Sequence, residues 1–111
     1  MTDVTFHDDV VEIRITDERV DAAAAPLLKR TLDETMTGAP NKVVLDLALV
    51  QFMDSTGLGV FVSLLKKLGP DGSIAAAGVQ PAVLRLFQLT RLDTLFRIVP
   101  DMAAARALVR G

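Results

Sequence analysis

Apolar and polar side chains alternate near the start of the chain and predict an opening β-hairpin. Val11, Ile13 and Ile15 occupy every second position, which is the spacing of a strand with one buried face. Residues 4–6 alternate in the same way, and the aspartates at 8–9 separate the two runs. We therefore expect the chain to begin with two antiparallel strands.

Beyond residue 22 the apolar positions take the spacing of one face of a helix. The recurring positions are Ala25, Leu28, Leu32 and Met36. Pro26 is tolerated only in the first turn, and Gly38 supplies a residue that adopts a left-handed conformation easily. The pattern predicts a helix from about Ala25 to Gly38.

Three strand–helix units follow this first helix. Each unit consists of a short apolar strand and an amphipathic helix that follows it. The three strands are residues 43–47, 73–78 and 96–99, and the helices after them pass through Leu58, begin at Pro81 and begin at Met102. Strands that alternate with helices imply right-handed crossovers and a largely parallel sheet. The chain is predicted to form a single mixed α/β domain over residues 1–111, with an N-terminal hairpin and about four helices packed on the sheet.

Composition excludes several classes of function. The chain has no cysteine and only His7 as a histidine, so we expect no metal site, no cofactor and no enzyme activity. A net charge of −2, five phenylalanines and no Trp or Tyr argue against nucleic acid as a partner. No apolar run approaches the ~20 residues of a membrane span, and the first residues do not resemble a signal peptide. A cytoplasmic protein without membrane insertion is expected.

One segment departs from the local preferences of a helix start, and it reads Asp54-Ser55-Thr56-Gly57-Leu58-Gly59. Two glycines in the first turns of a helix cost about 1 kcal/mol each relative to alanine. Glycines there would let another backbone or a partner approach closely, and the helix N-terminus would accept a phosphate on Ser55. The alternative interpretation is that the three residues before Gly57 are ordinary capping residues.

Two other carboxylates can also be interpreted either as functional residues or as structural ones. Asp46 ends a nearly all-apolar strand, close to the sheet edge where α/β proteins place their sites. Asp21 lies just before the first helix. Each is either a functional residue or a residue that ties a loop or turn by hydrogen bonds. His7 is expected to be a surface residue of the hairpin.

Residues 44–47 and 50–60 closely resemble the phosphorylation segment of bacterial anti-sigma factor antagonists, a family that shares the STAS domain. The resemblance extends from about residue 4 to residue 109 and includes the order of elements and Asp21. It implies a STAS-type fold with its core at about 4–109.

The resemblance also implies a function. In that family the unphosphorylated antagonist binds an anti-sigma factor that is itself a serine kinase, and the sigma factor is freed. Phosphorylation, here at Ser55, abolishes binding, and a serine phosphatase restores the active form. The partner-binding residues implied are Asp21, Asp54, Thr56, Gly57, Leu58 and Gly59. A monomer is expected.

The chain departs from the family pattern at three places. Residues 18–21 read Glu-Arg-Val-Asp where Gly-Glu-Leu-Asp is usual, Ala24 replaces the common hydroxyl residue, and Arg91 replaces a common glycine, which leaves the left-handed turn there open. Two other functions remain compatible with the sequence. One is an unphosphorylated interaction subunit, for example of a lipid-transport ABC system. The other is a partner-switching regulator whose target is not a sigma factor.

Overall fold

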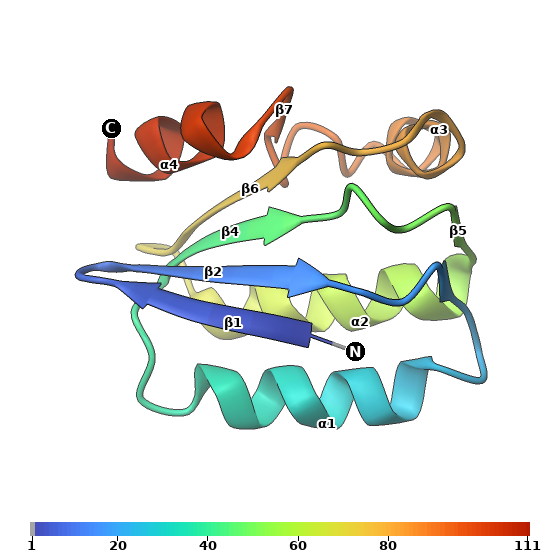
Figure 1. The fold of residues 1–111 in the computed structure, drawn as a ribbon, viewed down its shortest axis with the longest axis horizontal. Coiled ribbons are helices and arrows are strands. Elements are labelled where there is room, and N and C mark those ends of the chain that lie inside the picture. Colours follow the sequence, from blue (N-terminus) through green and yellow to red (C-terminus); the bar gives the residue numbers. More distant parts are fainter. Residues whose placement is uncertain (1) are drawn as a thin grey trace.

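A five-stranded mixed sheet forms the middle layer of the structure, a computed structural model that describes residues 2–111 (Figure 1). In spatial order its strands are β1 (Thr2–His7), β2 (Val10–Ile15), β4 (Lys42–Asp46), β6 (Ser73–Ala77) and β7 (Ile98–Val99). β1 and β2 pair antiparallel, and the other neighbouring strands pair parallel. The predicted hairpin and the mostly parallel sheet are confirmed.

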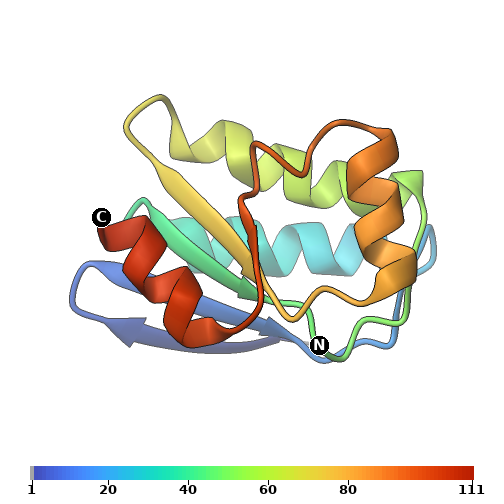
Figure 2. The same ribbon diagram turned by 90° about the horizontal axis from the view of Figure 1, so that it is seen from above.

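Four helices pack on this sheet within the described residues, as predicted. They are α1 (Ala25–Met36), α2 (Ser55–Leu68), α3 (Pro81–Leu89) and α4 (Met102–Arg110). α1 and α2 lie side by side on one face, and α4 covers the other (Figures 1 and 2). The larger core lies under α1, α2 and α3, whereas a smaller core of mostly short side chains lies under α4: Val10, Val44, Ala75, Ala77, Ala105 and Val109.

Turn geometry differs from the expectations in detail. α1 ends at Met36, two residues earlier than predicted, although Gly38 is left-handed with φ of 72° as expected. The strand predicted at 96–99 shrinks to Ile98–Val99 because Arg97 is left-handed, with φ of 47°. Arg91 also adopts φ of 61°, so the turn keeps its left-handed geometry without a glycine.

A second, two-stranded sheet was not predicted. It pairs β3 (Arg19–Val20) with β5 (Phe52–Met53) in parallel. Strands of two residues are too short to show an alternating pattern in the sequence. This small sheet joins the loop before α1 to the loop before α2.

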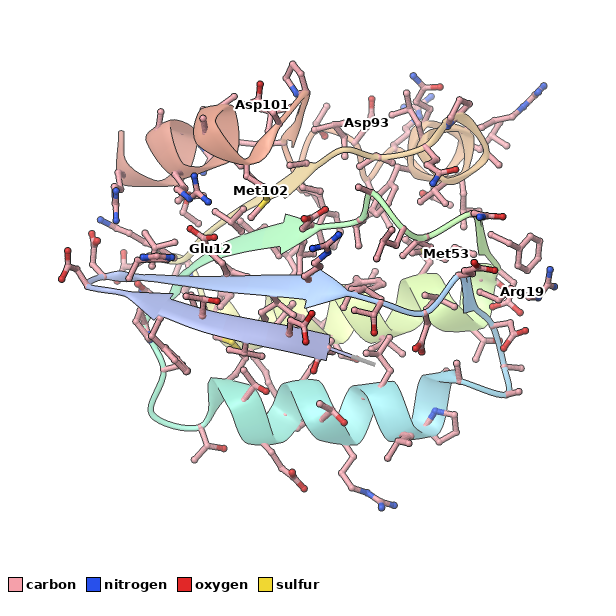
Figure 3. All side chains as sticks on the ribbon, in the orientation of Figure 1. Glu12, Arg19, Met53, Asp93, Asp101 and Met102 are labelled. Carbon is pink, nitrogen blue, oxygen red and sulfur yellow. The ribbon has the colours of Figure 1, made fainter. Side chains whose placement is uncertain are left out.

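One ion pair fastens α4 to the sheet. Glu12 of β2, labelled in Figure 3, is only 8% exposed. The guanidinium of Arg106 donates to both of its carboxylate oxygens, with Nη2 3.0 Å from Oε1. His7 Nε2 lies 3.4 Å from the same carboxylate. The hydrogen bond from Arg106 holds the pKa of Glu12 below its ordinary value of 4.5. Sequence patterns gave no sign of this pair.

Arg106→Leu should lower the free energy of unfolding at pH 7 by about 2 kcal/mol, because it leaves the Glu12 carboxylate buried without its partner. The pKa of Glu12 is lowered on folding, so the contribution of the pair is complete above about pH 4.5 and is lost as the pH falls through the folded pKa. Urea unfolding of wild type and variant should therefore show a difference that shrinks in acid. Arg85→Leu, at an exposed position of α3, serves as the control with a change below about 0.5 kcal/mol. A difference independent of pH would contradict this account.

Candidate functional site

The small sheet brings the two predicted aspartates together. The amides of Gln51 and Phe52 donate to the carbonyl oxygen of Glu18 at 2.8 and 3.1 Å, and the Asp54 amide donates to that of Val20 at 3.3 Å. The loop that carries Asp21 is therefore held along the loop that carries Asp54. Because each loop leads directly into a helix, the N-termini of α1 and α2 lie at the same end of the molecule (Figure 1).

Asp54 is the N-cap of α2 and also bridges the two loops. Its Oδ1 accepts from the amide of Gly57 at 2.9 Å, which satisfies one of the free amides of the first turn. Its Oδ2 accepts from the amide of Ala22 at 3.3 Å. The capping interpretation is thus correct for Asp54, and the same carboxylate also binds the loop before α1.

The two glycines of the segment have different environments. A Cβ added at Gly57 would lie 2.8 Å from the carbonyl carbon of Val20 and closer still to its oxygen. Gly57 is therefore required by the close approach of β3 to the first turn of α2. A Cβ at Gly59 would meet nothing within 4 Å, and Gly59 is exposed. Only Gly59 leaves open space at the surface.

Gly57→Ala should lower the free energy of unfolding by about 3 kcal/mol, because either Val20 or the start of α2 must move to admit the methyl group. Gly59→Ala is the matched control on the same helix. It should leave stability unchanged or raise it by up to about 1 kcal/mol, since alanine favours the helix. Urea unfolding measures both. Similar losses in the two variants would show that the packing of Gly57 against Val20 is not the reason for its size.

Ser55 is the first residue of α2, and its side chain is exposed. Within residues 2–111 neither its hydroxyl nor that of Thr56 makes a hydrogen bond, and the backbone amides of these two residues have no acceptor. α2 is 14 residues long, so the positive end of its dipole coincides with these amides. The arrangement offers an accessible hydroxyl where a bound anion would be stabilised.

Asp21 compensates for the missing hydroxyl at Ala24. Ala24 is the N-cap position of α1 and makes no side-chain cap, but Asp21 Oδ1 accepts from the amides of Ala23 and Ala24, each at 3.2 Å. The hydrogen bond from the Ala24 amide holds the pKa of Asp21 below its ordinary value. Arg19, whose Nε lies 3.5 Å from Asp21 Oδ2, lowers this pKa further. The turn interpretation is correct for Asp21, which also lies beside the Asp54 bridge.

Arg19 and Phe52 belong to this region although the sequence did not indicate them. The guanidinium carbon of Arg19, which is labelled in Figure 3, lies 4.3 Å from the centre of the Phe52 ring. Both side chains reach solvent. They face each other because the β3–β5 register pairs these two positions. An exposed aromatic ring beside an arginine is typical of contact surfaces.

Leu58 corrects one expectation. The family resemblance implied Leu58 as a partner-binding residue, but Leu58 is only 4% exposed and belongs to the main core. Its position on the helix points it toward the sheet, whereas Ser55, Thr56 and Gly59 lie at the surface. Gly57 is likewise buried. Leu58 and Gly57 therefore support the first turn of α2 from the core and do not form part of its exposed surface.

Asp46 ties a loop. Its Oδ1 accepts from the amide of Ala48 at 3.0 Å, and Arg14 Nε lies 3.8 Å from its Oδ2. Asp46 has no direct bond to Asp21 or Asp54, so the structure supports the loop-tying interpretation. His7 lies exposed on the hairpin, as expected.

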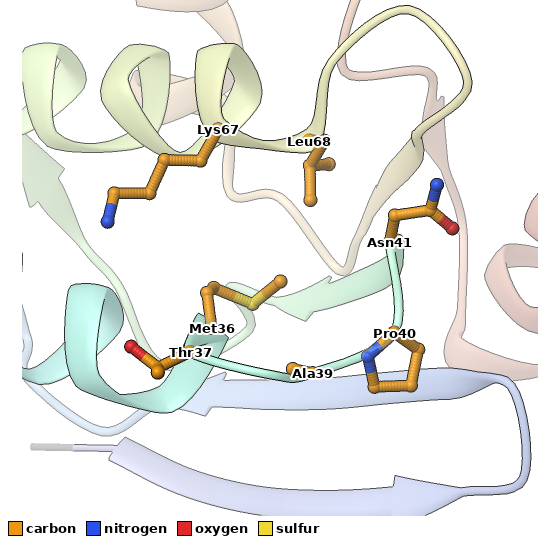
Figure 4. Close-up of a pocket in the computed structure, with 7 residues that line it drawn as sticks. All are labelled: Met36, Thr37, Ala39, Pro40, Asn41, Lys67 and Leu68. Atoms are coloured by element: carbon orange, nitrogen blue, oxygen red, sulfur yellow. The ribbon is translucent and has the colours of Figure 1, made fainter.

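A shallow groove adjoins Ser55 between the first turns of α1 and α2. Its volume is about 260 Å³, and it is lined by Ala25, Pro26, Lys29, Thr56, Gly59 and Val60. Another cavity of about 260 Å³ lies at the opposite ends of the same helices, among Met36, Thr37, Lys67 and their neighbours, and it contains none of the predicted site residues (Figure 4).

Two absences hold for the described part of the chain. No group of three or more His, Cys, Asp or Glu side chains is arranged to hold a metal ion. No helix is long and apolar enough to cross a bilayer.

Comparison with known proteins identifies the family. The family model described as STAS domain matches residues 1–105. An anti-sigma-B factor antagonist of Staphylococcus epidermidis is 37% identical over 93 residues, which cover 83% of this chain and 85% of the relative. The corresponding antagonist of Staphylococcus aureus (strain NCTC 8325 / PS 47) is 32% identical over 97 residues, covering 86% of this chain and 89% of the relative.

A solved structure agrees with these sequence relatives. The crystal structure of an anti-sigma factor antagonist from Mycobacterium paratuberculosis matches with a TM-score of 0.90 and 30% identity, covering 100% of this chain and 94% of that one. Proteins so named are regulatory binding proteins rather than enzymes. The chain therefore belongs to the STAS domain family, in the group of bacterial anti-sigma factor antagonists.

Proposed function

We propose that this antagonist works by partner switching: its unphosphorylated form binds an anti-sigma factor that is also a serine kinase, and phosphorylation of Ser55 ends the binding. The observation that carries the proposal is the Ser55 hydroxyl, exposed and without a partner within residues 2–111, at the N-terminus of a long helix. A kinase needs this accessibility. The anti-sigma-B factor antagonists named above support the class of partner.

The docking face is proposed to surround Ser55. Asp21, Asp54, Thr56 and Gly59 surround it in the sequence or across the bridged loops, and the groove at Thr56 and Gly59 admits a side chain of the partner. Gly57 and Leu58 contribute from inside by holding the first turn of α2 in place.

Phosphate on Ser55 is compatible with the fold. It would carry a charge of about −1.5 to −2 at the positive end of the α2 dipole, near two amides that lack acceptors. The adjacent Asp54 carboxylate opposes it, but that carboxylate is already bound to the amides of Gly57 and Ala22. The modification therefore changes the charge of the surface and leaves the core intact.

The same phosphate would disrupt docking because nearby cations of the chain are already paired. Lys29, on the wall of the groove, lies 2.9 Å from the Asp33 carboxylate, and Arg19 contacts Asp21. A phosphate at the centre of the interface would have to lose its water without Lys29 or Arg19, since both already have a carboxylate partner. That cost weakens the complex.

Ser55 should be the sole phosphate acceptor. Intact-mass measurement after incubation with the cognate kinase and ATP should show one added phosphate, and Ser55→Ala should remove it. Thr56→Ala should leave it in place, because Thr56 is exposed but lies one residue further into the helix. Phosphate that persists in Ser55→Ala would assign the acceptor role to another residue.

Ser55→Asp should weaken binding to the kinase by 10²-fold or more, because an unpaired charge must be desolvated at the interface, whereas Ser55→Ala should bind as the unmodified chain does. Ser63→Asp adds the same charge to α2 two turns further on and is the control. Calorimetric titration measures the three affinities. Equal affinity for Ser55→Asp and wild type would contradict the phosphorylation switch and favour the unphosphorylated interaction subunit.

The remaining parts of the cycle complete the proposal. A serine phosphatase returns the phosphorylated chain to its binding form, the chain acts in the cytoplasm, and the partner-switching target is a sigma factor. Affinity capture with Ser55→Ala from the native organism tests the class of direct partner. Recovery of a serine kinase supports a switch, and recovery of an ABC ATPase supports the alternative subunit.

A further inference from the structure

The two edges of the main sheet are unlike each other. β7 ends one edge with two residues, whereas β1 presents six residues at the other edge. Its pairing with β2 runs without a bulge from Thr2↔Ile15 to His7↔Val10. In Figure 2 no helix or strand of residues 2–111 lies beyond the outer side of β1. β1 contains no lysine and no proline, so its edge lacks most of the features that prevent pairing with another strand.

The hairpin geometry determines which backbone groups face outward. The loop has two residues, and Asp8 within it is left-handed with φ of 50°. In such a hairpin the flanking residues form a hydrogen-bonded pair, and these pairs alternate along the strands. Asp3, Thr5 and His7 then direct their backbone groups to β2. Val4 and Phe6 direct theirs to the open edge.

Side chains along β1 complement a second copy of the same strand. We propose that two copies of this chain pair antiparallel through β1 about a two-fold axis at Thr5, which joins their sheets into one. Val4 of each copy then lies opposite Phe6 of the other, and Asp3 lies opposite His7. This register also fits the backbone hydrogen bonds. The outward-facing N–H and C=O groups of Val4 in one copy lie opposite those of Phe6 in the other.

Phe6 gives the pairing an apolar contribution. It is 57% exposed in the single chain, one of the few large apolar side chains at the surface, whereas Val4 beside it packs partly on the main core. In the paired sheet Phe6 covers Val4 of the other copy on the face that carries α1. The acidic side chain of Asp3 faces the imidazole of His7, which already lies 3.4 Å from the Glu12 carboxylate.

The association is weak and leaves the Ser55 face free. Six residues per strand bury far less surface than a stable dimer needs, so a Kd of about 10⁻⁴ M is the expected order. At protein concentrations well below this Kd the chain is the monomer that is expected from the sequence. None of the residues proposed for partner docking lies on β1, so a dimer presents two such faces, and the proposal is independent of the partner-switching function.

Sedimentation velocity from about 10 µM to about 1 mM tests the association. Wild type should shift toward a dimer, and Phe6→Lys should weaken the shift at least about tenfold, because lysine on an edge strand opposes pairing. Leu89→Lys is the matched control, since Leu89 is 75% exposed and lies on α3. Both variants should keep the circular dichroism of wild type. Monomeric wild type at about 1 mM, or equal association of the two variants, would overturn the proposal.

The register has its own test, because the chain contains no cysteine. A two-fold axis at Thr5 places the two Thr5→Cys side chains directly opposite each other, at a distance that a disulfide can span. Asp3→Cys places its two thiols four residues apart along the strands. Under mild oxidation the Thr5→Cys dimer should form at least about tenfold faster. Equal rates would overturn the proposed pairing.

Discussion

The contact between the first turn of α2 and the carbonyl group of Val20 is the constraint on which the site depends. It exists only because Gly57 has no side chain. With α2 this close to β3, the amide of Asp54 reaches the Val20 carbonyl, and the Asp54 carboxylate reaches the amide of Ala22. The small sheet, the cap of α2 and the loop before α1 are therefore one connected unit. Ser55 is exposed because that unit holds the residues on either side of it.

Backbone amides, more than cations, satisfy the carboxylates around Ser55. Asp54 is bound by two amides and has no ion pair within residues 2–111. Asp21 is bound by two amides and has a longer contact with Arg19. The face is consequently acidic and already internally bonded. A phosphate added to Ser55 finds the helix amides within this face, but no unpaired arginine or lysine among the cations named there. In the proposed switch, the same arrangement would make the fold tolerant of the phosphate and the surface sensitive to it.

The main elements could be predicted from the sequence because hydrophobic periodicity reports long segments well. The hairpin and the four helices extend over enough residues to show their period. β3 and β5 could not be predicted, since two residues have no period, and their pairing depends on chain segments about thirty residues apart. Because these strands were not predicted, the contact between Arg19 and Phe52 could not be predicted either, since only the β3–β5 pairing brings the two residues together.

Individual residues of the candidate site show the same limit. Gly57 and Gly59 are identical letters two positions apart, and only the neighbouring strand distinguishes a glycine required by packing from one in open space. Leu58 was implied as a partner-binding residue, but its position on the helix places it in the core. The segment could be identified as a candidate site from its composition. Which of its side chains reach a partner depends on tertiary structure.

The core is divided into two layers, and this division separates the candidate site from the interactions that hold α4 on the sheet. The layer under α1 and α2 contains the large apolar side chains, whereas the layer under α4 combines small residues with the Glu12–Arg106 pair. Ser55 lies at the end of the first layer, outside both. A charge change at Ser55 would therefore act on a surface supported by the larger apolar core, whereas the Glu12–Arg106 pair lies on the opposite face of the sheet. Ser55 and the Glu12–Arg106 pair are not in contact. The proposed phosphorylation of Ser55 would therefore change the docking surface without weakening the interaction that holds α4.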